Sequence, residues 1–107
     1  MILTEIQAGI CGFRTTVRAR SEDSQNVSLD ITSTCEKIAA LATDLGTIDA
    51  YREIGDGFDG HIHKAALRHL KGCCAGCAVP SGIFKSVQVA GCVALPAPVS
   101  ITIARME

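Results

Sequence analysis

The regular alternation of side chains from residue 13 to residue 20 constrains the fold more than any other feature of this chain. The odd positions carry Phe13, Val17 and Ala19, whereas three of the four even positions carry arginine. A period of two is typical of a strand with one buried face and one face in water. The segment 13–20 is therefore predicted to be a strand in a sheet that is covered on one face.

Two further segments show the same period. Residues 1–8 place Ile2, Thr4 and Ile6 on one face, and residues 27–32 alternate after the polar turn 21–26. The first turn, Gly9-Ile10-Cys11-Gly12, is bracketed by glycines, which tolerate a positive φ. Three strands with short connections predict an antiparallel meander. Its solvent face is expected to carry Arg14, Thr16, Arg18, Ser28, Asp30 and Thr32.

Helical patterns follow the third strand. Ser33-Thr34-Cys35-Glu36 has the spacing of a capping box, with Ser33 as the predicted cap. Apolar positions every three or four residues continue this helix to Gly46, a natural stop. We expect a short second helix from Thr47 to about Ile54 with Ile48 and Tyr51 turned inward, a third over 61–70, and a fourth from Pro80 to about Gly91.

The last part of the chain has a strand pattern again. Leu95-Pro96-Ala97-Pro98 is predicted to be a rigid connector, and Val99, Ile101 and Ile103 indicate a closing strand over 99–104. A sheet with one apolar face needs a layer on that face. We predict a single α+β domain over residues 1–107, with a three-stranded antiparallel meander plus a C-terminal strand and helices packed on one face.

Composition narrows the possible partners. The net charge is −1 with both signs mixed, which provides no electrostatic footprint for nucleic acid or an acidic membrane. The chain has three Phe, one Tyr and no Trp, so a base-stacking platform is not expected. No apolar run reaches the roughly 18–20 residues that span a bilayer. The first residues carry no basic region of a signal peptide, so we expect a cytoplasmic protein.

The six cysteines are Cys11, Cys35, Cys73, Cys74, Cys77 and Cys92. Clustered cysteines in a reducing compartment indicate metal or redox chemistry more often than disulfides. Cys11 is expected at a hairpin tip and Cys35 in the first turn of a helix. Because the second and third strands carry the chain away and back, these two residues are predicted to share one end of the sheet.

Further thiols are predicted to complete a site at that end. Cys74-Ala75-Gly76-Cys77 is a C-x-x-C knuckle with small middle residues. The start of a helix favours the thiolate form of Cys35, and thiolates bind zinc or an iron–sulfur cluster through about four ligands. We predict ligation by Cys11, Cys35, Cys74 and Cys77, with Cys73 as the substitute for Cys74.

Other interpretations stay open from the residues alone. All six cysteines could be inert core residues, and Cys92 is expected to be one in either case. A metal-free dithiol at Cys74 and Cys77 and a structural zinc module are the competing classes. The histidines are expected at the surface, with His69 as a reserve ligand.

The cysteine arrangement resembles the iron–sulfur cluster scaffolds of the IscU and NifU N-terminal type. Cys11-Gly12 matches their first hairpin, Cys35 their helix start after strand three, and Cys77 their loop before a late helix, which residues 83–87 fit. The resemblance covers about residues 1–90. It implies their meander fold and an iron–sulfur cluster, with a protein partner as cluster donor or acceptor. The mixed charge and the lack of a long apolar run predict no nucleic-acid or membrane partner.

The chain departs from the scaffolds beside the first cysteine. They carry Asp two residues after it, where this chain has Phe13. A fourth thiolate in place of that Asp implies a cluster or zinc that stays bound. Cys77-Ala78-Val79-Pro80 also resembles a segment of a small uncharacterised family of anaerobic prokaryotes, which implies no activity. We predict a cysteine-ligated metal-binding protein rather than an enzyme.

Overall fold

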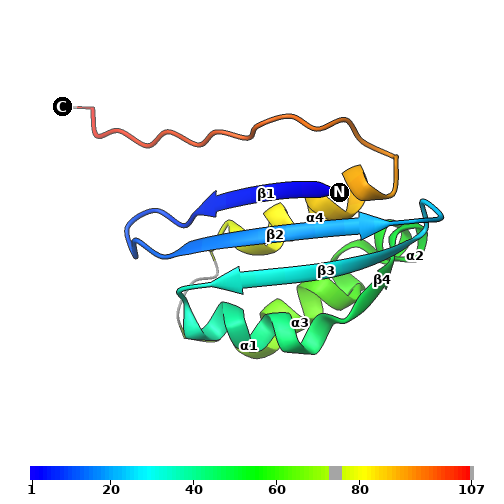
Figure 1. Cartoon of the computed structure of the whole chain (residues 1–107). Coiled ribbons are helices and arrows are strands. Elements are labelled where there is room, and N and C mark those ends of the chain that lie inside the picture. Colours follow the sequence, from blue (N-terminus) through cyan, green and yellow to red (C-terminus); the bar gives the residue numbers. More distant parts are fainter. Residues whose placement is uncertain (73–75, 107) are drawn as a thin grey trace.

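The computed structural model describes residues 1–72 and 76–106. These residues form a four-stranded sheet and a layer of helices (Figure 1). In chain order, the elements are β1 (Ile2–Gln7), β2 (Arg14–Ser21), β3 (Asn26–Ser33), α1 (Glu36–Leu45), β4 (Thr47–Asp49), α2 (Ala50–Asp56), the 3-10 turn η1 (Gly57–Asp59), α3 (His61–His69) and α4 (Val79–Ala90).

The sheet is antiparallel throughout, in the order β1-β2-β3-β4. Val17 on the central strand β2 lies opposite Thr4 of β1 and Ile31 of β3. The predicted three-stranded antiparallel meander is confirmed. The predicted solvent positions are exposed apart from half-buried Thr16. Phe13, predicted on the buried face, instead precedes β2 and is 41% exposed.

All the helices lie on one face of the sheet (Figure 1). Helix α4 packs on β1 and β2, and α1 packs on β3 and α3. Val17, Ala19 and Val27 of the sheet are fully buried beneath these helices. The helices contribute Ile38, Leu41, Ile62, Ile83 and Val87 to the same core. The predicted α+β class, with helices on one face, is therefore confirmed.

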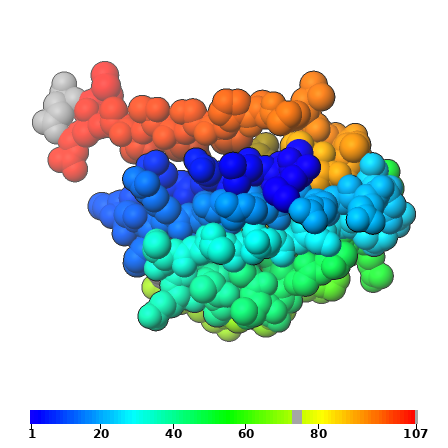
Figure 2. Space-filling view, viewed as in Figure 1, coloured from blue at the N-terminus to red at the C-terminus, as the bar shows by residue number. Residues whose placement is uncertain are grey.

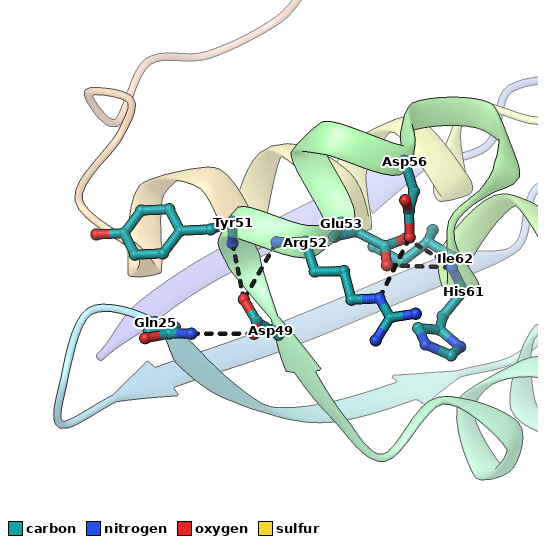
Figure 3. A network of polar contacts seen from close by, with 8 residues as sticks. All are labelled: Gln25, Asp49, Tyr51, Arg52, Glu53, Asp56, His61 and Ile62. Carbon is teal, nitrogen blue, oxygen red and sulfur yellow. Dashed lines mark hydrogen bonds and ion pairs between the residues drawn. The ribbon is translucent and has the colours of Figure 1, made fainter.

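The region between α1 and α2 differs from the prediction of a helix over 47–54. Thr47–Asp49 instead forms β4, in which Ile48 pairs with Val27 and is 1% exposed. Helix α2 begins after Asp49, whose Oδ1 accepts hydrogen bonds from the N–H groups of Tyr51 and Arg52, both at 3.1 Å (Figure 3). Tyr51, predicted to point inward, is 53% exposed. The residue at position 49 is a stronger cap than Thr47 because its carboxylate accepts two bonds.

A buried carboxylate joins α2 to α3. Glu53 is 1% exposed, and it accepts bonds from His61 N to Oε1 at 3.1 Å and from Ile62 N to Oε2 at 2.8 Å (Figure 3). These N–H groups belong to the first turn of α3 and have no partner within the helix. A Cβ at Gly60 would lie 2.5 Å from Glu53 Oε2, so glycine is needed there for close approach.

The closing strand predicted over 99–104 is wrong. The trailing segment, residues 93–106, forms neither helix nor strand, and it extends beyond β1 in Figures 1 and 2. Its alternating side chains Val99, Ile101 and Ile103 are 63%, 74% and 91% exposed. Local alternation makes a segment competent to form a strand, but a strand forms only where the segment pairs with a neighbour, and residues 99–104 have no such pairing in the single chain.

Among residues 1–72 and 76–106, no helix has both the length and the apolar character needed to cross a membrane.

Candidate metal centre

Three cysteines that are distant in sequence meet at one end of the sheet. Cys11 lies in the turn from β1 to β2, Cys35 directly precedes α1, and Cys77 lies two residues before α4. All three line one cavity of about 30 Å³. The structure thus brings together three of the five cysteines that the sequence singles out.

Cys11 is presented by a tight glycine turn. Gly12 N donates to Gly9 O at 2.9 Å, and Ala8 N donates to Phe13 O at 3.2 Å. Gly9 and Gly12 have φ values of +92° and +73°, which a residue with a side chain rarely adopts. The turn leaves Cys11 exposed at its tip.

Cys35 is the N-cap residue of α1, one position earlier than the predicted first turn. Its φ and ψ are −88° and 120°, and its carbonyl accepts the Ala39 N–H at 2.9 Å. The predicted cap at Ser33 is wrong. Ser33 is the last residue of β3, and its Oγ accepts the N–H of Cys35 at 3.1 Å instead of an N–H group of the helix. The Cys35 side chain is half-buried and packs against the core.

A pair of hydrogen bonds holds the Cys11 and Cys35 loops together. Arg14 N donates to Thr34 Oγ1 at 3.0 Å, and Thr34 N donates to Arg14 O at 3.1 Å. Arg14 opens the strand after Cys11, whereas Thr34 directly precedes Cys35. This link positions both cysteines. No local sequence pattern predicts it, because it depends on the strand register.

Cys77 is placed by the start of α4. It is half-buried and packs against the core beside Val79, the first residue of the helix. Pro80 lies in the first turn, as predicted, where its missing N–H leaves no intrahelical bond unmade. The fixed start of α4 therefore holds Cys77 against the cavity.

The donor set suits a soft metal. The cavity is lined by three thiols and otherwise by apolar side chains and one threonine, namely Ala8, Phe13, Thr15, Ile38, Leu70 and Val79. Thiolates in such surroundings select zinc or iron–sulfur clusters over hard cations. Within residues 1–72 and 76–106, no three His, Cys, Asp or Glu side chains are already grouped closely enough to hold an ion. The predicted ligands Cys73 and Cys74 lie outside the described residues.

One family model matches residues 2–103, a range that includes all six cysteines. The chain belongs to the family of unknown function DUF6951. No curated protein and no solved structure matches it. The cysteine geometry is therefore interpreted from its own chemistry.

Cys92 differs from its predicted place in the core. It is exposed, has a φ of +62°, and its Sγ accepts a hydrogen bond from Ser24 Oγ at 3.4 Å. The residue follows the end of α4, so it lies at the opposite end of that helix from Cys77. Cys92 thus has no part in the thiol cavity.

His69 has a partner away from the thiol cavity. Asp44 Oδ2 contacts His69 Nε2 at 2.8 Å and accepts bonds from Arg68 Nε at 3.1 Å and Nη2 at 2.8 Å. The bonds from Arg68 and then His69 lower the pKa of the Asp44 carboxyl below its usual value. The structure accordingly places this reserve ligand in an ion-pair cluster with Asp44.

A second, larger groove borders the thiol cavity and shares Cys77 with it. Its volume is about 460 Å³, and it lies between η1, α3 and the start of α4. His63 lines the groove and contacts the rings of Phe58 and Phe84, with centroid distances of 4.9 and 5.6 Å. No local sequence pattern had indicated this groove, because its walls come from three separate elements.

Proposed function

We propose that this chain binds an iron–sulfur cluster or zinc through Cys11, Cys35, Cys77 and one thiol of the Cys73-Cys74 pair. One observation carries the proposal, namely that three loops far apart in sequence each deliver a cysteine to the same cavity. Core cysteines without a shared role have no reason to converge on one space at the end of a sheet.

The surroundings support an oxygen-sensitive or tightly held metal group. Cys35 and Cys77 are half-buried against the hydrophobic core, whereas Cys11 is exposed. A partly buried thiolate site limits the access of water, and hydrogen bonds and burial around the sulfurs tune the potential of a cluster. When bound, a cluster would supply one-electron chemistry or be passed on as cargo.

The proposed role is cluster carriage or electron transfer in the cytoplasm, with a protein partner as cluster donor or acceptor. The exposed tip at Cys11, flanked by fully exposed Ile10, provides a point where such a partner can approach the site. We do not propose turnover of a small organic substrate, because the described residues that line the thiol cavity are, apart from the three thiols and Thr15, all apolar.

A structural zinc module is the second candidate, and the packing of the thiols favours it specifically. Cys35 caps α1 and Cys77 precedes α4, and both contact the core. An ion that linked these two residues would tie the two helices together and add its binding energy to the stability of the fold.

The first experiment is metal and sulfide analysis, with a visible spectrum, of protein purified without oxygen. Iron with matching sulfide and a colour that dithionite bleaches would establish the cluster. About one zinc per chain, with helicity lost on chelation, would establish the zinc module. A colourless, metal-free protein would overturn both and favour a metal-free dithiol.

Serine variants test the shared site. Cys11→Ser, Cys35→Ser and Cys77→Ser are each expected to abolish stable metal binding, because each removes one of about four ligands. Cys92→Ser is the matched control, since Cys92 is an exposed thiol outside the cavity. Unchanged metal content in any of the first three variants would refute the shared site. Cys73→Ser and Cys74→Ser, compared side by side, identify the fourth ligand.

A further inference from the structure

Strand β1 lies at one edge of the sheet with β2 as its only strand neighbour among the described residues. Its six residues contain no proline and one charged side chain, Glu5. The opposite edge is formed by β4, which has only three residues. A long, flat edge strand exposes N–H and C=O groups that can pair with another strand, whereas a short one does not.

The packing of β1 shows that its outer side is uncovered. Ile2 and Ile6 point toward the helices, but both are only half-buried, whereas Val17 and Ala19 of β2 are fully buried on the same face. Gly82 of α4 lies close to Ile6, and Ser86 Oγ donates to Thr4 Oγ1 at 2.7 Å. Helix α4 therefore covers the face of β1 that carries Thr4 and Ile6. A fifth strand beside β1 would cover the remaining side of Ile2 and Ile6.

The trailing segment of the chain contains residues with the composition of a β-strand. Residues 99–104 read Val-Ser-Ile-Thr-Ile-Ala, with β-branched residues at four of six positions. Val99, Ile101 and Ile103 share one face and are at least 63% exposed. A stripe of exposed apolar side chains with strand period marks an interaction surface rather than a solvated tail.

We propose that residues 99–104 of one copy add to the β1 edge of a second copy, and that the second copy returns its own segment. The two copies then form a two-fold symmetric dimer with two five-stranded sheets. One chain supplies both the open edge and the apolar strand, so two copies satisfy each other without a further partner. The exchange buries Val99, Ile101 and Ile103 in both halves.

The direction of the segment favours the second copy over pairing within one chain. In Figure 1 the trailing segment leaves the end of α4 and runs in the same direction as β1. Pairing within one chain would therefore be parallel, whereas a two-fold axis perpendicular to the strands makes the exchanged pair antiparallel, which is the more stable arrangement. The connector Leu95-Pro96-Ala97-Pro98 is stiff and extended. The segment that follows it runs alongside β1 of its own chain without forming a strand there (Figures 1 and 2).

Sedimentation equilibrium of the full chain, with two matched variants, tests the exchange. The native chain is expected to dimerise. Ile101→Asp is expected to raise the dimer dissociation constant by roughly 100-fold, because it places a charge in both exchanged strands. Thr102→Asp adds the same charge on the opposite face of the same strand and is expected to change the constant only slightly. Both positions lie outside the helices, so circular dichroism should show an unchanged helix content in both variants.

Hydrogen exchange provides the second measurement. In the native dimer, the outward N–H groups of β1 and those of residues 99–104 should be protected together, and Ile101→Asp should expose both sets. A native chain that is monomeric at every attainable concentration would overturn the proposal, even if its trailing segment were protected, because pairing would then be internal. A dimer that Ile101→Asp leaves intact would overturn it as well.

Discussion

The two ends of the sheet use polar loop residues in different ways. At the end formed by the β2–β3 turn and the β4–α2 junction, Asp23 and Asp49 accept bonds from backbone N–H groups. Glu53, one turn further along α2, does the same for α3. At the other end, Cys11, Cys35 and Cys77 border a cavity. The carboxylate end and the thiol end are thus built by the same meander with different side chains.

The difference shows how structural and functional loop residues can be separated. Each carboxylate satisfies backbone donors that folding would otherwise leave without a partner, so its chemistry is used within the fold. The thiols are brought together by backbone links such as Arg14 to Thr34, which organise the loops around the cavity. We therefore expect changes at the carboxylate end to affect stability and changes at the thiol end to affect metal binding.

The largest effect on stability is expected from Glu53→Gln. The amide keeps one acceptor oxygen but turns an NH2 group toward a backbone N–H, and the site is buried. Loss of one charge-assisted bond in this setting should lower the free energy of unfolding by about 2–3 kcal/mol. Urea unfolding measures it, with Glu22→Gln in an exposed turn as the control. Equal stability of Glu53→Gln and Glu22→Gln would contradict the structural role of the carboxylate end. Metal loss in Glu53→Gln but not in Glu22→Gln would show that this end also affects metal binding.

An intermediate effect is expected from Thr34→Val at the thiol end. The variant removes the oxygen that accepts the Arg14 N–H and should cost about 1 kcal/mol of stability. It should also weaken metal binding several-fold, because the loops of Cys11 and Cys35 lose one of their two links. Competition with a chelator measures the affinity, and Thr32→Val on the open face is the control. A stability loss without a change in affinity would show that the link does not position the thiols.

The smallest effect is expected from Asp23→Ala, and it depends on pH. Backbone hydrogen bonds from Asn26 and then Gln25 hold the pKa of Asp23 well below its usual value. A carboxyl whose pKa is lowered by folding stabilises the native state above its unfolded pKa of about 3.9, and this contribution is lost as the pH falls through the lower folded value. The variant should therefore melt below the native chain near neutral pH.

Thermal unfolding followed as a function of pH tests this dependence. The difference between Asp23→Ala and the native chain should stay constant down to about pH 5 and shrink below about pH 4. Glu22→Ala in the same turn is the control. A difference that grows toward acid would contradict the assigned role of the Asp23 carboxylate.

The sequence predicted the features that depend on short-range periodicity. The alternation at Phe13 to Arg20 defined both faces of β2, and the return of the chain along β3 placed Cys11 and Cys35 at one end. The apolar spacing and Gly46 defined α1, and Pro80 marked the start of α4. These features were predictable because each follows from a local pattern combined with a simple rule of connection.

The features that were missed depend on pairing between distant residues. Ile48 could belong to a helix or a strand by its local pattern, and its pairing with Val27 decides for the strand. The segment 99–104 has a strand pattern but no ladder in the single chain. Cysteine is a common core residue, but Cys92 follows the end of α4 and is exposed there. Contacts with residues distant in sequence decide whether these segments form a strand and whether these side chains are buried. A local sequence pattern carries no information about those contacts.

The order in which the three cysteine-bearing loops come together during folding has a consequence for biogenesis. The turns of the meander are short, so the loops of Cys11 and Cys35 can meet early at a low cost in chain entropy. Cys77 arrives only when α4 docks on β1 and β2, after a much longer stretch of chain has closed. We expect the nascent polypeptide to expose an incomplete two-thiol site until α4 is in place. Docking of that helix would then be the step that completes the proposed metal site.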